Sequence, residues 1–279
     1  MEVVEEGGEE ENAAGRTRLK RFYFADEEDD DDDAALLVTI PEVSGGRAVR
    51  VTSRWRRGDC CCCHHRRVCV QVLDPHYGMY VWPCSVVLAQ FVWHNRALVR
   101  DQLVLELGAG TALPGIVAAR CGATVTLSDL PRCLPSCAHS CRVNGLDGSV
   151  PVLGLRWGLV TPSLVTMPPL DIILGSDILY EPRDFEAVLV TVSYLLNKNP
   201  HGQFWTTYQE RSAEWSLEPL LLKWGLWCRL VEPAAFRGDS PTLAGSSLPG
   251  DHTVHMCIIT RVITHDTTQR DLAWSSNRR

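Results

Sequence analysis

The stretch LVLELGAGTALPG at 103–115 constrains the fold more than any other part of this 279-residue sequence. An apolar run with one acidic residue, Glu106, meets a turn containing Gly108 and Gly110, and an apolar helical segment follows at 116–121. This order predicts a buried strand, a tight turn and a helix that opens beside a ligand, because glycine permits backbone conformations and close approaches that a Cβ would block. We expect Glu106 to reach a polar ligand or a structural partner.

The spacing of the glycines argues against two phosphate-binding motifs. A dinucleotide fingerprint needs its third glycine three positions after the second, whereas Gly115 comes five positions after Gly110. No Lys-Ser/Thr pair follows, so the turn is not a P-loop either. A cofactor without phosphates fits better. On its own, such a turn is just as typical of an ordinary strand–helix connection.

An acidic residue in the next segment strengthens the ligand interpretation. Ala123–Asp129 is rich in β-forming residues and ends in Asp129, about 20 residues after the glycine turn. A carboxylate at this place in a doubly wound sheet can accept hydrogen bonds from both hydroxyl groups of a ribose. The alternative is that Asp129 caps the following helix. The glycine turn and the spaced acid together predict a nucleoside cofactor.

A second group of polar residues follows a later apolar run, DIILGSDILYEP at 171–182. Its polar residues are expected at the carboxyl edge of the sheet, where open α/β sheets bind ligands. Asp184 is expected to cap the next helix. Trp82 begins an apolar helical pattern with Pro83, and an aromatic residue, Trp157, follows the third predicted strand. Each tryptophan is a candidate wall of the cofactor pocket, with core packing as the alternative.

Length and composition favour one intracellular α/β domain. A chain of this length can hold an α/β domain of about 200 residues, and 45% hydrophobic residues can fill its core. The sequence has no apolar run of about 18 residues and no apolar signal core, which argues against a membrane span and against secretion. The 12 cysteines are therefore interpreted as reduced thiols of the cytosol or nucleus. Three of them, Cys133, Cys137 and Cys141, share a helical face, and buried packing is favoured there over metal binding.

The acidity of the chain belongs to its N-terminal segment. Residues 1–33 hold 14 acidic and 4 basic residues, whereas the remaining chain holds 20 acidic and 23 basic residues. This composition predicts a disordered tail over 1–33. The tail is either an arm that attracts basic partners or simply a solvated segment. Residues 34–42 are more apolar and are expected to form an ordered lead-in, with a short strand as one possibility.

The segment 43–71 is basic and carries Cys60, Cys61, Cys62, Cys63, His64 and His65. Adjacent ligands do not easily converge on one tetrahedral ion, and the usual Cys-x₂₋₄-Cys spacing is absent, so a zinc site is disfavoured. A disordered basic loop is the main alternative. A third hypothesis is a translated intron, because Val43-Ser44 and Gln71 can be encoded by splice-site-like sequences, and removing 43–71 joins Glu42 smoothly to Val72.

Taken in order, several motifs resemble one known family, the family 16 lysine methyltransferase group of seven-β-strand methyltransferases. The motifs are VWP, LELGAGTALPG, VTLSD, LRWG, DIILGSDILYEP and TYQERSAEWSLEPLLLKW. The resemblance covers 72–262, the expected catalytic domain, and leaves 263–279 as a polar C-terminal tail. It implies an α/β fold with a Rossmann-like, mostly parallel seven-stranded sheet, an antiparallel last strand and helices on both faces. It also implies S-adenosylmethionine as the cofactor, and no metal is expected.

The resemblance also assigns roles by position. Near the cofactor it places Trp82, Glu106, Gly108, Gly110, Asp129, Trp157 and Ser176. In this assignment the glycine turn and Glu106 approach the methionine part, Asp129 holds the ribose, and the two tryptophans line the pocket. The sequence Asp177-Ile178-Leu179-Tyr180 matches the group's Asp/Glu-x-x-Tyr/Phe motif beside the substrate nitrogen. Asp177 is the preferred carboxylate and Tyr180 a channel wall, with Glu181 and Glu210 as further catalytic candidates.

The acceptor is less well defined than the cofactor. A lysine must lose its proton before transfer, whereas an arginine stays charged and needs carboxylates to orient its planar group. The member of the group that the motifs resemble most implies methylation of arginine on histone H3, linked to transcription. The wider group mostly modifies lysines of non-histone proteins. A third alternative is a non-catalytic module that binds chaperones or transcription factors. We expect the protein in the nucleus and cytoplasm, without direct DNA or membrane binding.

Overall fold

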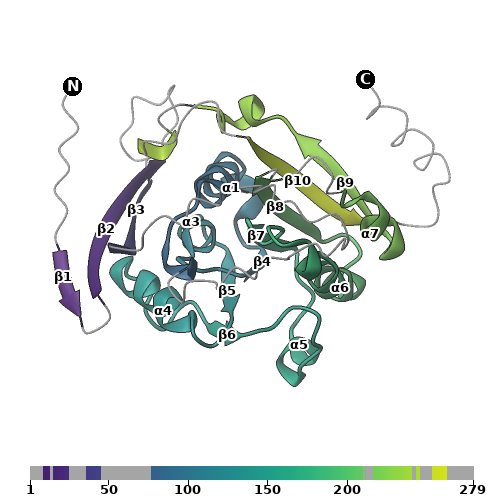
Figure 1. Ribbon diagram of the computed structural model, residues 1–279, viewed down its shortest axis with the longest axis horizontal. Coiled ribbons are helices and arrows are strands. Elements are labelled where there is room, and N and C mark those ends of the chain that lie inside the picture. Colours follow the sequence, from purple (N-terminus) through teal and green to yellow (C-terminus); the bar gives the residue numbers. More distant parts are fainter. Residues whose placement is uncertain are drawn as a thin grey trace, which may run out of the picture.

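The computed structural model describes residues 9–12, 15–24, 36–44, 77–209, 211, 216–240, 243–245 and 253–262. Its centre is a seven-stranded sheet in the order β6-β5-β4-β7-β8-β10-β9 (Figure 1). The strands are β4 (Leu103–Leu107), β5 (Thr124–Asp129), β6 (Val152–Gly154), β7 (Ile172–Ser176), β8 (Gln203–Gln209), β9 (Leu226–Val231) and β10 (Val254–Arg261). The pairs among β4 to β8 are parallel, and β10 runs antiparallel to both β8 and β9. The predicted fold class is confirmed.

Helices cover both faces of this sheet, and alternate residues of each central strand supply the two cores. Val104 of β4 and Ile172 of β7 pack with the helices on one face, whereas Leu105 and Ile173 pack with those on the other. Burial on both faces explains why these strands are continuous apolar runs. The first face carries α1 (Pro83–His94), α2 (Arg96–Val99), α3 (Leu113–Arg120) and α4 (Leu134–Val143); the second carries α5 (Pro162–Thr166), α6 (Pro182–Lys198) and α7 (Glu218–Lys223).

Two helices begin earlier than the sequence pattern indicated. Helix α3 starts at Leu113 rather than 116, and Pro114 occupies its first turn, where a missing N–H costs little. Helix α6 starts at Pro182, so Asp184 lies inside the first turn and Glu181 is the preceding residue. The prediction that Asp184 caps this helix was therefore wrong.

Three short 3₁₀ helices are η2 (Tyr77–Met79), η3 (Pro233–Phe236) and η4 (Leu243–Gly245). None of the helices in the described residues is long and apolar enough to cross a membrane.

A small antiparallel sheet, β1 (Glu9–Asn12), β2 (Gly15–Phe24) and β3 (Leu36–Ser44), packs beside α3 and α4 (Figure 1). Phe24 and Ile40 are almost fully buried in the first core. The side chain of Asn144 exchanges hydrogen bonds with the backbone of Thr39, with its Oδ1 accepting from the Thr39 N–H at 2.9 Å and its Nδ2 donating to the Thr39 carbonyl. The segment 1–33, for which the composition predicts disorder, contains β1 and β2. At the end of β2 the buried Phe22 and Phe24 alternate with the exposed Arg21 and Tyr23.

The expected lead-in at 34–42 contains most of β3, which continues to Ser44 and so enters the predicted insertion by two residues. The rest of that insertion, including its cysteine and histidine run, lies outside the described residues. The three hypotheses for 43–71 therefore stay predictions, as does the boundary at 72.

Candidate active site

The glycine turn after β4 has the backbone geometry that the sequence predicted. Gly108 and Gly110 have φ values of +61° and +56°, which favour glycine. A Cβ on Gly108 would lie 2.7 Å from Ile178 Cγ2 and 2.9 Å from the ring of Trp157, and a Cβ on Gly110 would lie 3.0 Å from the Gly78 carbonyl. The turn is thus closely packed against residues that follow β6 and β7 and that precede α1.

Glu106 has the structural partner that was one of its two expected roles. Its side chain is fully buried, and Oε2 accepts a hydrogen bond of 2.9 Å from the N–H of Gly115 in α3. Gly115 must be glycine, because a Cβ there would clash with Glu106 Oε2 and Leu127. Burial raises the pKa of Glu106 from 4.5 to about 8, although the bond from Gly115 lowers it. Glu106 therefore acts on the glycine turn by joining β4 to α3.

Asp129 ends β5 beside the glycine turn. Its Oδ2 accepts a hydrogen bond of 2.8 Å from the Gly110 N–H, and its Oδ1 accepts one of 2.6 Å from the Leu130 N–H. Burial raises the pKa of this carboxyl group, and the two backbone N–H groups oppose that effect. The Gly110 carbonyl accepts a bond of 3.3 Å from the thiol of Cys137, which is fully buried on α4. The cysteine face of α4 thus supports the turn, as a packed face was expected to do.

The segment from η2 to the start of α1 runs between the glycine turn and β8, along the carboxyl edge of the sheet. Gly78 packs on Gly110 at one end, and at the other end the Cys84 carbonyl accepts a hydrogen bond of 2.8 Å from Thr207 Oγ1 of β8. Trp82 lies between these points, partly exposed, with its ring 5.0 Å from that of Tyr80. This places Trp82 at the edge where the sequence predicted a pocket wall.

Asp177 follows β7 in a left-handed conformation, with φ of +52°. Its N–H donates to the Thr207 carbonyl at 2.8 Å, which holds the backbone of Asp177 against β8. Its carboxylate accepts two hydrogen bonds from Arg211, of 2.9 Å from Nη1 to Oδ1 and 2.6 Å from Nη2 to Oδ2. Burial, and then the charge of Asp177, raise the pKa of the neighbouring Cys84 thiol. Sequence reasoning missed Arg211, although a cation just after a strand beside β7 was a usable signal.

Most of the other predicted residues lie at or after the ends of β6 and β7. Ser176 is the last residue of β7 and pairs with Thr207, while Tyr180 and Glu181 are partly exposed between β7 and α6. Trp157 is also partly exposed and packs beside Gly108. Glu210 lies outside the described residues. The structure therefore places Gly108, Gly110, Asp129 and Trp157 at or after the ends of β4, β5 and β6, and Ser176, Asp177, Tyr180 and Glu181 at or after the end of β7. Trp82 directly precedes α1, and Glu106 lies inside β4.

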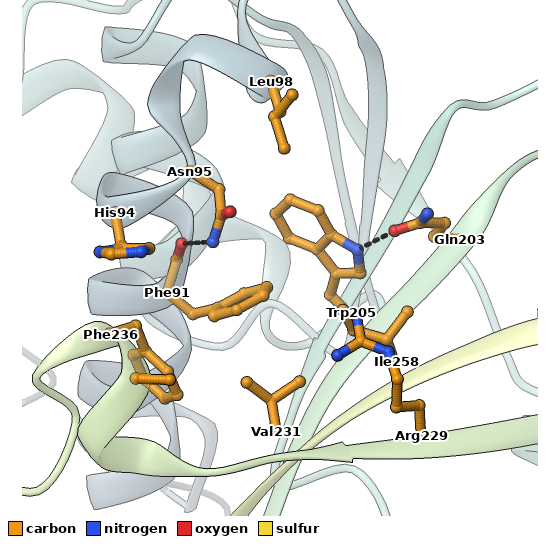
Figure 2. A pocket seen from close by; sticks show the side chains of 11 residues that line it. Phe91, His94, Asn95, Leu98, Gln203, Trp205, Arg229, Val231, Phe236 and Ile258 are labelled. Carbon is orange, nitrogen blue, oxygen red and sulfur yellow. Dashed lines mark hydrogen bonds between the residues drawn. The ribbon is translucent and has the colours of Figure 1, made fainter.

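A separate cavity of about 320 Å³ lies between α1 and the strands β8, β9 and β10 (Figure 2). It is lined mainly by aromatic and polar side chains, including Phe91, Trp205, Phe236 and Arg229, and Trp205 Nε1 donates to Gln203 Oε1 at 2.7 Å. Gln203 is the first residue of β8, so this cavity is at the amino end of that strand. None of the predicted site residues lines it.

The carboxyl edge fits a nucleoside cofactor without phosphates. The backbone at Gly108 and Gly110 is closely approached by its neighbours, which a Cβ would prevent. Asp129 accepts one backbone N–H on each oxygen and a further hydrogen bond from the Cys133 thiol, and a carboxylate offers about four acceptor sites in all. Asp129 thus retains capacity for a hydroxyl donor such as one of a ribose. The aromatic ring of Trp157 adds a flat apolar surface at the same edge.

Comparisons with known proteins agree with this geometry. A family model described as lysine methyltransferase matches residues 70–216, more than half of the chain. The chain belongs to this methyltransferase family. It is accordingly a protein methyltransferase, and its cofactor is S-adenosylmethionine.

Three relatives within the family differ in what their names say they modify. Histone-arginine methyltransferase METTL23 of Xenopus laevis is 57% identical over 193 residues, covering 68% of this chain and 82% of that protein. METTL23 of Homo sapiens is 51% identical over 184 residues, covering 65% of this chain and 96% of that protein. Protein N-lysine methyltransferase METTL21A of Danio rerio is 38% identical over 118 residues, covering 41% of this chain and 54% of that protein. The closer motif resemblance, to methyltransferase-like protein 23, is thereby confirmed.

We predict that Glu106→Gln removes a pH-dependent loss of stability. Between pH 4.5 and about 8 the unfolded chain ionises Glu106 while the folded chain keeps it protonated, so folding stability falls as pH rises. The free energy of unfolding of the variant, relative to wild type, should rise by about 1 kcal/mol per pH unit across this window and then level off. Urea unfolding at several pH values measures it.

Glu218→Gln, at an exposed position in the first turn of α7, is the matched control and should follow the wild-type curve. Parallel curves for Glu106→Gln and wild type would show that Glu106 is ionised in the folded protein, contrary to the account of the β4–α3 junction.

Proposed function

We propose that the protein transfers a methyl group from S-adenosylmethionine to an arginine side chain of a histone, with histone H3 as the favoured acceptor and transcription as the affected process. The observation that carries the proposal is the carboxylate of Asp177, which binds a guanidinium group through two parallel hydrogen bonds. The METTL23 relatives, whose names describe histone-arginine methylation, support the same acceptor. The proposal places the protein in the nucleus, with its acceptor, and in the cytoplasm.

The proposed mechanism assigns binding and alignment to the chain. The bound cofactor supplies a sulfonium with a reactive methyl group. The glycine turn and Asp129 would hold the methionine and ribose parts, and Trp82, Trp157 and Ser176 would shape the pocket around them. Asp177 would orient the guanidinium so that one nitrogen faces the methyl group, which favours transfer by proximity. Tyr180 would form a wall that attracts the cation through its ring. Glu181 and Glu210 are further candidates beside the acceptor.

Lysine methylation of a non-histone protein is the second candidate function. It is supported by the description of the matching family and by the METTL21A relative. An ammonium is a point charge and does not match a carboxylate in two parallel bonds, so the geometry at Asp177 favours arginine. A non-catalytic module that binds chaperones or transcription factors is the remaining alternative, and those partners stay predictions.

For the cofactor half of the site, we predict that Asp129→Ala weakens binding of S-adenosylhomocysteine at least about tenfold, because charged hydrogen bonds to the ribose are lost. Isothermal titration calorimetry measures the affinity. Asp129→Asn keeps one acceptor oxygen and should give an intermediate loss. Unchanged affinity in Asp129→Ala would remove this residue from the site. Absence of binding by well-folded wild-type protein would instead support the non-catalytic module.

For the acceptor half, we predict that Asp177→Asn lowers methyl transfer about a hundredfold or more while cofactor affinity is retained, because the acceptor is no longer aligned. Labelled-methyl transfer to histones and to a cell extract, followed by mass spectrometry of the products, measures the rate and identifies the modified residue. Asp184→Asn, on the first turn of α6, is the control. Full turnover by Asp177→Asn would exclude the assigned role, and methyl-lysine as the sole product would support the second candidate.

A further inference from the structure

Arg211 pairs with the Asp177 carboxylate in the same two-bond geometry that is proposed for the acceptor arginine. Both terminal nitrogens donate to the carboxylate, one to each oxygen. The side chain of Asp177 is 6% exposed and that of Arg211 is 23% exposed, so the guanidinium is the more accessible group of the pair. Arg211 therefore occupies the carboxylate oxygens that an acceptor guanidinium would need.

The surroundings of Asp177 require a cation at this place. The bond to Thr207 fixes the backbone of Asp177, and the buried thiol of Cys84, in the first turn of α1, lies beside its carboxylate. A buried carboxylate without a partner is strongly destabilising, because water no longer solvates its charge. Any event that removes Arg211 from Asp177 must therefore supply another cation to the same oxygens.

We propose that Arg211 is the resting-state occupant of a guanidinium receptor on Asp177 and is exchanged for the arginine of the incoming substrate. The exchange conserves one positive charge and two parallel N–H bonds, so it costs little when the incoming group is a guanidinium. A lysine ammonium restores the charge but not the paired bonds, so it exchanges poorly. The paired acceptors of Asp177 thus favour arginine over lysine, and Arg211 is the occupant that the substrate displaces. This inference rests on the proposed arginine methylation and names the residue that the substrate replaces.

The first test asks whether Asp177 is a receptor for free guanidinium, and it does not depend on activity. In full-length Arg211→Ala, millimolar guanidinium chloride should raise the melting temperature by several degrees, whereas methylammonium chloride and sodium chloride should not. Wild type should show no rise, because Arg211 already occupies the carboxylate. Arg183→Ala removes an exposed arginine that lies 4.0 Å from Asp184 and is the matched control without a response. Arg211→Lys keeps the charge, so guanidinium chloride should raise its melting temperature by a smaller amount. This variant replaces Arg211→Ala in the test if the alanine variant folds poorly.

The second test measures the exchange itself. An arginine-containing histone peptide should bind Arg211→Ala at least about fivefold more tightly than wild type in the presence of S-adenosylhomocysteine, because the competing side chain is gone. The same peptide with lysine at that position should not gain affinity. Equal binding of the arginine peptide to both proteins, or no guanidinium response, would overturn the inference and leave Arg211 as a permanent ion pair. A guanidinium response in a protein that methylates only lysine would refute the proposed function but retain the receptor.

Discussion

The hydrogen bond from the Gly115 N–H to the buried carboxyl group of Glu106 joins the central strand to helix α3, and the glycine turn between them depends on it. Its effect extends along the edge. Gly110 in that turn donates to Asp129 of β5 and accepts from the Cys137 thiol of α4, and the carbonyl of Gly78 packs beside it. Three segments from other parts of the chain thus converge on one residue, which fixes the backbone where the cofactor is expected.

A second carboxylate organises the neighbouring half of the edge. Asp177 connects β7 to β8 through the Thr207 carbonyl and through Arg211, and the chain reaches the same place at Cys84. The carboxyl groups of Glu106 and Asp129 accept hydrogen bonds from backbone N–H groups, and that of Asp177 accepts them from Arg211. In the proposed mechanism, such arrangements would hold the cofactor and the acceptor in alignment for methyl transfer.

The sequence predicted the sheet well because each strand is an apolar run and the glycine turn has a local cause. Other features depend on contacts that no local pattern contains. The role of Glu106 was left open, yet it lies two residues from Val104 and therefore on the face that α3 covers. The pairing of Arg211 with Asp177 joins residues 34 positions apart and arises only because β8 lies beside β7. The hairpin of β2 and β3 was missed because strong charge concealed the alternation of Phe22 and Phe24 with exposed residues.

We propose that Asp177, at the carboxyl edge of the sheet, meets an acceptor guanidinium beside the cofactor. The most direct test is a crystal structure of the full chain with S-adenosylhomocysteine and an arginine-containing histone H3 peptide. We predict that the cofactor product lies against Gly108, Gly110 and Asp129, and that the peptide guanidinium lies on Asp177 with Arg211 displaced. A complex in which the peptide arginine lies elsewhere while Arg211 stays bonded to Asp177 would contradict it.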